Sequence, residues 1–153
     1  MTDDLNKKFP EEFYRGLSSM DQITEEGFIK AAAFSFPKDT KRQDGLCELS
    51  INWNDDEGSL DNLAHRRKVG SNEQQFKIGY CIVNRVAMEQ NMLFYIKANK
   101  LSYERRPEEA REDNDYQENK YHGNLLMPKN IDGNLRKNIQ HTLATLAQVK
   151  YEW

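Results

Sequence analysis

The alternation of apolar and polar residues is clearest in the middle of the chain. Apolar side chains occupy every second position from Cys47 to Trp53, which is the period of a pleated strand with one buried face. Residues 76–83 repeat the alternation, and their last residues are apolar on both sides, which is typical of a central strand. These two runs predict the middle of a sheet.

Shorter apolar runs predict the remaining strands. The aromatic run 13–17 precedes a turn, and residues 28–34 suit a strand or one helical turn followed by a strand. Further strand material is predicted at residues 92–98, 101–103 and 121–127, the first two arranged as a hairpin.

Two segments have the spacing of helices. Ser59 suits the N-cap of a short helix that extends to about Lys68. Leu135, Ile139 and Leu143 recur every four residues and so lie on one helical face, which should pack on the sheet. We therefore predict an α+β fold: a mostly antiparallel sheet of about five to six strands, a short central helix, and a C-terminal amphipathic helix packed on the sheet.

The chain length of 153 residues suits one domain, residues 1–153. We expect residues 1–10 to be a flexible N-terminal segment and residues 105–119 to be a charged, exposed loop. No apolar run approaches the length of about 20 residues that spans a bilayer, and the N-terminus lacks a signal-peptide pattern, so the prediction is a cytoplasmic protein with reduced, buried cysteines.

The 22 basic and 25 acidic residues give a net charge of −3, which provides no general attraction to nucleic acid or anionic lipid. Nucleic-acid binding would need a local patch, and the densest is Arg66, Arg67 and Lys68. The same three cations also suit the end of a helix, where they complement its dipole.

His122 and Arg15 are the main candidates for a functional site, catalytic or ligand-binding, with Glu48 as a possible third member. His122 opens a strand after a polar loop, and Tyr121 and Asn124 could orient it toward a ligand. Arg15 lies among aromatic and aliphatic residues, where a guanidinium must pair with a carboxylate, bind an anion or extend to the surface. For both residues the alternative is a purely structural hydrogen bond or ion pair.

The sequence contains few motifs that would indicate a metal site or a cofactor site. The acidic turn 55–57 could chelate a cation together with Glu48, and residues 118–120 match the Glu-x-Lys end of a nuclease site. The three histidines lie far apart in the sequence, without zinc-ligand spacing, and no phosphate-binding loop is present. We expect neither a metal nor a cofactor.

Two resemblances rest on short motifs. Residues 14–16 (Tyr-Arg-Gly) and 121–123 (Tyr-His-Gly) resemble motifs that hold the nicotinamide nucleotide in ADP-ribosyltransferases, but the stretch with a second tyrosine and a glutamate is missing after His122. The order of the early Arg15 and the late Tyr-His-Gly-Asn run resembles a family of small bacterial proteins that has no established activity.

The leading functional hypothesis is a non-catalytic protein-interaction module that serves a bacterial multigene stress or antiviral system. It rests on missing catalytic signatures and on a charged loop beside Tyr121 and Trp153, which could form a contact surface with another protein. The first alternative is a small enzyme that acts on a phosphorylated or nucleotide-like ligand through Arg15 and His122. The second is a nucleic-acid binder, which would need residues 66–68 and Arg85 on one face with exposed aromatics.

Overall fold

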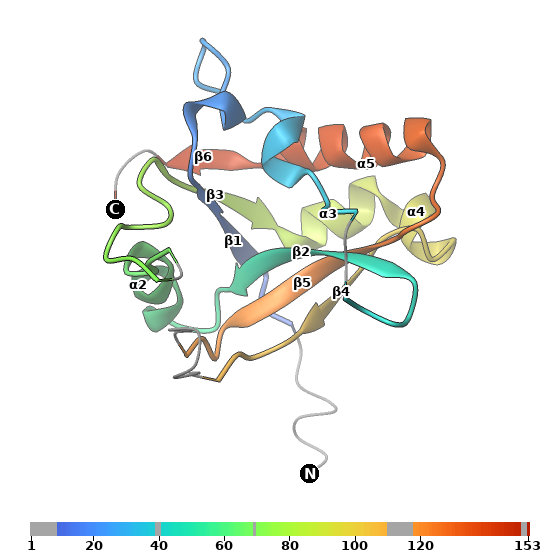
Figure 1. Ribbon diagram of the computed structural model, residues 1–153. Helices are drawn as coiled ribbons and strands as arrows, with labels where there is room; N and C mark the ends of the chain where they lie inside the picture. The colour runs from blue at the N-terminus through green and yellow to red at the C-terminus, as the bar shows by residue number, and fades with distance from the viewer. Residues whose placement is uncertain (1–8, 39–40, 69, 110–117, 151–152) are drawn as a thin grey trace.

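The computed structural model describes residues 9–38, 41–68, 70–109, 118–150 and 153. Within them, six strands form one antiparallel sheet in the order β4-β5-β2-β1-β3-β6, which confirms the predicted α+β class (Figure 1). The strands are β1 (Glu12–Leu17), β2 (Leu46–Trp53), β3 (Gly79–Asn84), β4 (Ser102–Arg105), β5 (His122–Pro128) and β6 (Gln148–Lys150).

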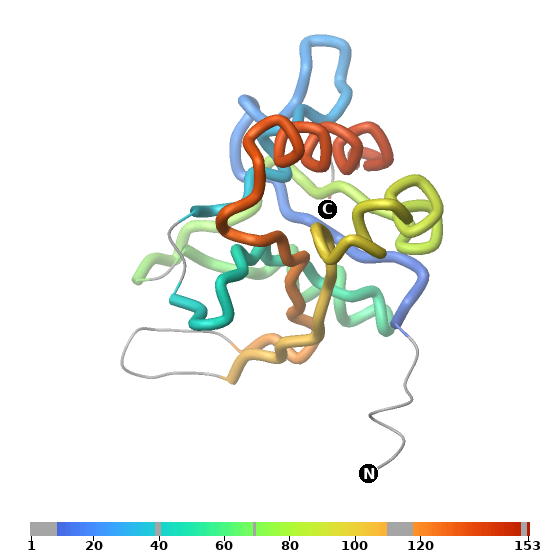
Figure 2. Tube along the Cα trace, turned by 90° about the vertical axis from the view of Figure 1, so that its right-hand side faces the viewer, coloured from blue at the N-terminus to red at the C-terminus, as the bar shows by residue number. Residues whose placement is uncertain are grey.

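Helical segments cover both faces of this sheet. The 3₁₀ turn η2 packs beside α5, and both views show this segment, drawn in blue, next to the red helix (Figures 1 and 2). The helices are α2 (Gly58–Ala64), α3 (Arg85–Asn91), α4 (Leu93–Lys97) and α5 (Gly133–Leu146), with 3₁₀ turns η1 (Met20–Gln22) and η2 (Ala31–Phe34).

The alternation of each strand sends apolar side chains to the face that α5 covers. Phe13, Ile51, Trp53 and Leu125 point to this side and are at most 2% exposed. Ile139 and Leu143 of α5 pack into the same core and are fully buried, as the helical spacing predicts.

The opposite face of the sheet has a smaller apolar cluster and a polar surface. Tyr14 and Tyr80 meet Leu63 of α2 there, and the two tyrosine rings contact edge to face with centroids 5.6 Å apart. Since α2 covers only this part of the sheet, the neighbouring stretch of β2 and β5 keeps its polar side chains, and the candidate site lies at this boundary.

Several predicted elements are confirmed within a few residues. Strands β1, β2 and β5 lie where the alternation places them, and Asp132 caps α5, because its carboxylate accepts from the backbone N–H groups of Asn134 and Leu135. Helix α2 ends at Ala64, so Arg66, Arg67 and Lys68 follow the helix instead of closing it.

The prediction of strands at residues 92–98 is wrong, because this segment is helical. Asn84 caps α3 by accepting a hydrogen bond from the Ala87 N–H group at 2.9 Å. Met88 and Met92, four residues apart, are then fully buried against the core. The helical period was not visible in the sequence, because Leu93 and Phe94 are apolar although they point to solvent.

The ends of the described chain add two observations. Phe9 packs its ring between Trp53 and Tyr103, at centroid distances of 4.9 and 4.8 Å, so the predicted flexible segment 1–10 is packed at its end, and residues 1–8 lie outside the described residues. Of the predicted loop 105–119, Arg105 closes β4 and residues 110–117 likewise lie outside the description.

Both cysteines are free and buried, as predicted. Burial raises the pKa of the Cys81 thiol to about 12, which keeps it protonated and unreactive at neutral pH. None of the helices in the described ranges has the length and apolar composition that crossing a membrane requires.

Candidate functional site

Strand register places His122 and Tyr14 on the same face of the sheet. Tyr14 is the partner of Asn52 across β1 and β2, and Asn52 is the partner of His122 across β2 and β5. Because directly opposed residues of antiparallel strands share a face, the three side chains form a row that runs across the sheet. This row is the floor of a cavity.

The cavity, which we call the α2 pocket, has a volume of about 160 Å³ and lies between the sheet, α2 and residues 66, 67, 75 and 76. An engineered protein cavity of about 150 Å³ holds one benzene molecule, so the α2 pocket has room for a single small group. Tyr14, Leu63 and Phe76 form its apolar walls. Its polar lining includes Asn52, Arg66, Arg67, Gln75, Glu108 and His122.

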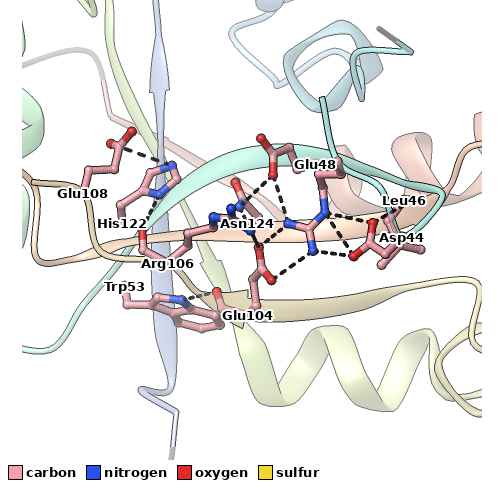
Figure 3. A network of polar contacts seen from close by, with 10 residues as sticks. Asp44, Leu46, Glu48, Trp53, Glu104, Arg106, Glu108, His122 and Asn124 are labelled. Carbon is pink, nitrogen blue, oxygen red and sulfur yellow. Dashed lines mark hydrogen bonds and ion pairs between the residues drawn. The ribbon is translucent and has the colours of Figure 1, made fainter. Parts of the chain in front are cut away.

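His122 is held in one orientation by the backbone. Its Nδ1 atom lies 2.7 Å from the Arg106 carbonyl oxygen, which only accepts, so Nδ1 carries the hydrogen. In the neutral ring Nε2 is then an acceptor, and it lies 4.0 Å from the Glu108 carboxylate (Figure 3). The His122 side chain is only 11% exposed and lines the pocket.

Arg66 enters the pocket beside Glu108. Its Nη2 atom donates to the Glu108 carboxylate at 3.4 Å, whereas Nη1 is buried and has no acceptor among the described residues. The backbone fixes the position of Arg66, because its carbonyl oxygen accepts from the Gln75 N–H group at 2.8 Å. A buried guanidinium donor without a partner costs about 1–3 kcal/mol, and an incoming acceptor would recover it.

A set of buried amides supports the floor of the pocket. Asn119 donates to the Asn52 side-chain oxygen at 2.8 Å, and Asn52 donates to the Ser59 carbonyl oxygen of α2 at 3.1 Å. Backbone pairing between Glu108 and Asn119 holds Glu108 at the rim. These bonds join α2, β2 and the segments around residues 108 and 119 into one rigid frame.

Tyr121 has a structural position instead of the predicted ligand contact. It is 7% exposed, and its hydroxyl group donates to the Asp56 carboxylate at 2.7 Å, a bond that raises the pKa of Tyr121. The buried ring also excludes Tyr121 from the contact surface that the sequence suggested beside Trp153.

Arg15 does not reach His122. It alternates with Tyr14 along β1 and lies on the face that η2 and α5 cover. Its Nε and Nη1 atoms donate to the carbonyl oxygens of Ala33 and Ser50 at 2.9 and 2.8 Å. Burial lowers the pKa of Arg15. The structure thus separates the two residues on which the enzyme hypothesis rests, and Arg15 joins β1, β2 and η2.

Glu48 and Asn124 belong to a second polar cluster on the same face as His122 (Figure 3). The Asn124 amide donates to the carboxylates of Glu48 and Glu104 at 3.2 and 2.8 Å, and Arg42 donates to both at 3.0 and 2.6 Å. Burial would raise the pKa of Glu104, but the hydrogen bonds from Arg42 and Asn124 outweigh it and lower that pKa. The cluster ties the segment before β2 to β4 and β5.

The acidic turn and the other basic residues are also engaged. Asp55 forms a two-bond ion pair with Arg105 at 2.7 and 2.8 Å, and among the described residues no group of three or more acidic, histidine or cysteine side chains could hold a metal. Arg85 pairs with Glu89 at the start of α3, and Trp53, one of the aromatics that nucleic-acid binding would need at the surface, is fully buried.

Sequence reasoning therefore identified His122, and identified Arg66 and Arg67 only as members of a charge cluster. Glu108 was missed, because it lies in the segment that was assigned to an exposed loop. Its place in the pocket depends on pairing with Asn119, eleven positions along the chain, and no local pattern signals that pairing.

No protein-family model, curated protein or solved structure matches this chain.

Proposed function

We propose that the chain is a binding module that holds a small anionic group, a phosphate or a carboxylate, in the α2 pocket. The observation that carries the proposal is the Nη1 atom of Arg66, a buried cationic donor that lines a cavity and meets no acceptor in the described part of the chain. Guanidinium groups bind carboxylate and phosphate oxygens through charge-assisted hydrogen bonds, which are about twice as strong as neutral ones.

The charges of the lining favour an anion. Arg66 and Arg67 contribute two cations and Glu108 one carboxylate, so the pocket has one net positive charge while His122 is neutral. The net positive lining therefore attracts an anion.

Like the enzyme hypothesis, this proposal has an anionic, phosphate-like ligand, but it assigns the binding of that ligand to a different arginine. Arg66 takes the anion-binding part that the sequence assigned to Arg15, while His122 keeps its place. Catalysis at His122 stays a prediction.

Calorimetric titration with inorganic phosphate and with acetate tests the proposal. We expect Arg66→Met to weaken binding by roughly 10- to 100-fold, since a hydrogen bond to a charged group contributes about 1.5–3 kcal/mol. Methionine keeps the aliphatic stem of Arg66 and removes its donors. Binding as tight as wild type in this variant, or no binding of either anion to the wild type, would refute the proposal.

Lys68→Met is the matched control. Lys68 follows Arg66 by two positions, and its exposed ammonium pairs with Glu73 at 3.2 Å instead of lining the pocket. Equal weakening by both substitutions would indicate general charge attraction, which also disappears at high salt. Thermal unfolding of each variant confirms that the fold is intact.

We also propose, as a second function, that α3 and α4 present a contact surface for a partner protein. Phe94, Leu93 and Val86 are 80%, 48% and 38% exposed, and all three belong to this one pair of short helices. Leu93 and Phe94 adjoin in α4, and neighbouring exposed apolar side chains are typical of interaction sites. This observation supports the interaction module that the sequence suggested, on a different surface from the charged loop.

Recovery of partners from the native host with tagged protein tests the second function. We expect Phe94→Ser to reduce capture of a specific partner by about 10-fold or more, as loss of a central aromatic anchor does. Phe28→Ser is the control, because Phe28 is 70% exposed but lies before η2, away from α3 and α4. Equal recovery by the two variants would contradict the proposal.

A further inference from the structure

Arg66 and Arg67 line a second hollow as well as the α2 pocket. This hollow, which we call the Trp153 hollow, lies on the outer side of α2 and has a volume of about 790 Å³. Leu60 and Ala64 of α2 form one wall, Asn72 and Gln74 another, and Trp153 contributes an aromatic ring. The two arginines therefore stand between a small, polar pocket and a larger hollow with an aromatic wall.

Two contacts hold the Trp153 side chain. Its indole ring stacks on Tyr80 with centroids 5.0 Å apart and an interplanar angle of 27°. Its Nε1 atom donates to the Phe76 carbonyl oxygen at 2.8 Å. Tyr80 in turn contacts Tyr14, which lines the α2 pocket. One face of the indole is thus covered and its edge is anchored, while the side chain remains 39% exposed and borders the hollow.

The free face of the Trp153 ring suits a flat ring of a ligand, which could stack on it. Stacking of a base on an aromatic side chain contributes about 1–3 kcal/mol, and no described residue places a ring on the second face of Trp153. Asn72 and Gln74 also line the hollow, where the Gln74 amide donates to the Ala64 carbonyl oxygen at 2.8 Å and Asn72 accepts from Arg67 at 3.2 Å. The volume of the hollow falls within the range of about 300–1,000 Å³ that is usual for small-molecule sites.

We propose that the site binds a ligand in which an anionic group is joined to a flat ring, and that its class is a nucleoside monophosphate. The phosphate binds Arg66 in the α2 pocket, and the base stacks on Trp153 in the adjoining hollow. This inference rests on the proposed anion-binding function and adds the second half of the ligand.

Titrations with four probes separate the parts of the ligand: adenosine monophosphate, ribose 5-phosphate, adenosine and inorganic phosphate. We expect adenosine monophosphate to bind about 10- to 100-fold more tightly than ribose 5-phosphate, which lacks the base. It should also quench the fluorescence of Trp153. The other tryptophan, Trp53, is fully buried in the core, so it serves as a constant background.

Two variants assign the effect to the ring. Trp153→Leu should remove the advantage of adenosine monophosphate over ribose 5-phosphate and leave phosphate binding unchanged. Trp153→Phe keeps a flat ring and should retain most of that advantage while it abolishes the quenching. Should Trp153→Leu fail to fold, the affinities of the wild type for the two phosphates and its quenching decide the question.

The outcomes distinguish this inference from the function on which it rests. Equal affinity of the wild type for adenosine monophosphate and ribose 5-phosphate would overturn the nucleotide class and leave the anion site intact. Undiminished binding of adenosine monophosphate by Trp153→Leu would do the same. Failure of every phosphate-bearing probe to bind would overturn both proposals.

Discussion

Gly123→Ala is expected to destabilise the protein by about 4 kcal/mol. A methyl group at this position on β5 would stand well under 3.0 Å from the Trp53 Nε1 atom and from the Glu104 carbonyl oxygen. These two atoms share a hydrogen bond of 3.1 Å, which the methyl group would break. Overpacking costs about 1–3 kcal/mol, and a lost hydrogen bond adds about 1 kcal/mol.

The Gly123 effect is large because neither neighbour can move aside. Trp53 is fully buried, and the Glu104 oxygen belongs to the backbone of β4, which pairs with β5. Urea unfolding measures the change, and Gly133→Ala is the control, because a methyl group there meets nothing within 4 Å at the start of α5. A loss below about 1 kcal/mol for Gly123→Ala would contradict the packing described.

Arg15→Met is expected to destabilise the protein by about 3 kcal/mol. The substitution removes both donors from the carbonyl oxygens of Ala33 and Ser50. Two charge-assisted bonds contribute about 1.5–3 kcal/mol each, and relief of the buried charge offsets part of that loss. Methionine fills a similar volume, so the change isolates the hydrogen bonds.

Urea unfolding measures this effect, and Lys97→Met is the control, since Lys97 is an exposed cation on α4.

The Arg15→Met variant also tests the role of Arg15 in binding. We expect folded Arg15→Met to bind phosphate as tightly as wild type, because Arg15 lies outside the lining of the α2 pocket. Full stability combined with lost binding would instead return Arg15 to the functional site.

The two arginines show how similar residues acquire different roles. Arg15 lies among apolar neighbours in the sequence, which made it conspicuous, yet its Nε and Nη1 atoms are bonded to backbone oxygens. Arg66 lies in a run of three cations, which is common on protein surfaces, yet it is only 16% exposed and lines the pocket. The surroundings of each guanidinium come from segments distant in the sequence.

Elements with a strong local period were predictable from the chain. The alternation from Cys47 to Trp53 and the spacing of Ile139 and Leu143 depend on burial of one face, and burial acts on each strand or helix separately. Helix α4 was mistaken for a strand because exposed Leu93 and Phe94 filled in the gaps of the helical pattern. Pattern reasoning assumes that apolar residues mark the buried face of an element, and these exposed apolar residues do not follow that assumption.

The amino-acid order alone was sufficient for the α+β class, for strands at the positions of β1 to β5, for helices at the positions of α2 and α5, and for His122 as a candidate. Tertiary structure decided the site, because antiparallel pairing brings Tyr14, Asn52 and His122 into one row from three separate strands. The bridge between residues 108 and 119 then places Glu108 beside Arg66. Such pairings depend on the order and register of the strands in the sheet. These are properties of the whole fold, and they produce no periodic sequence pattern in any single segment.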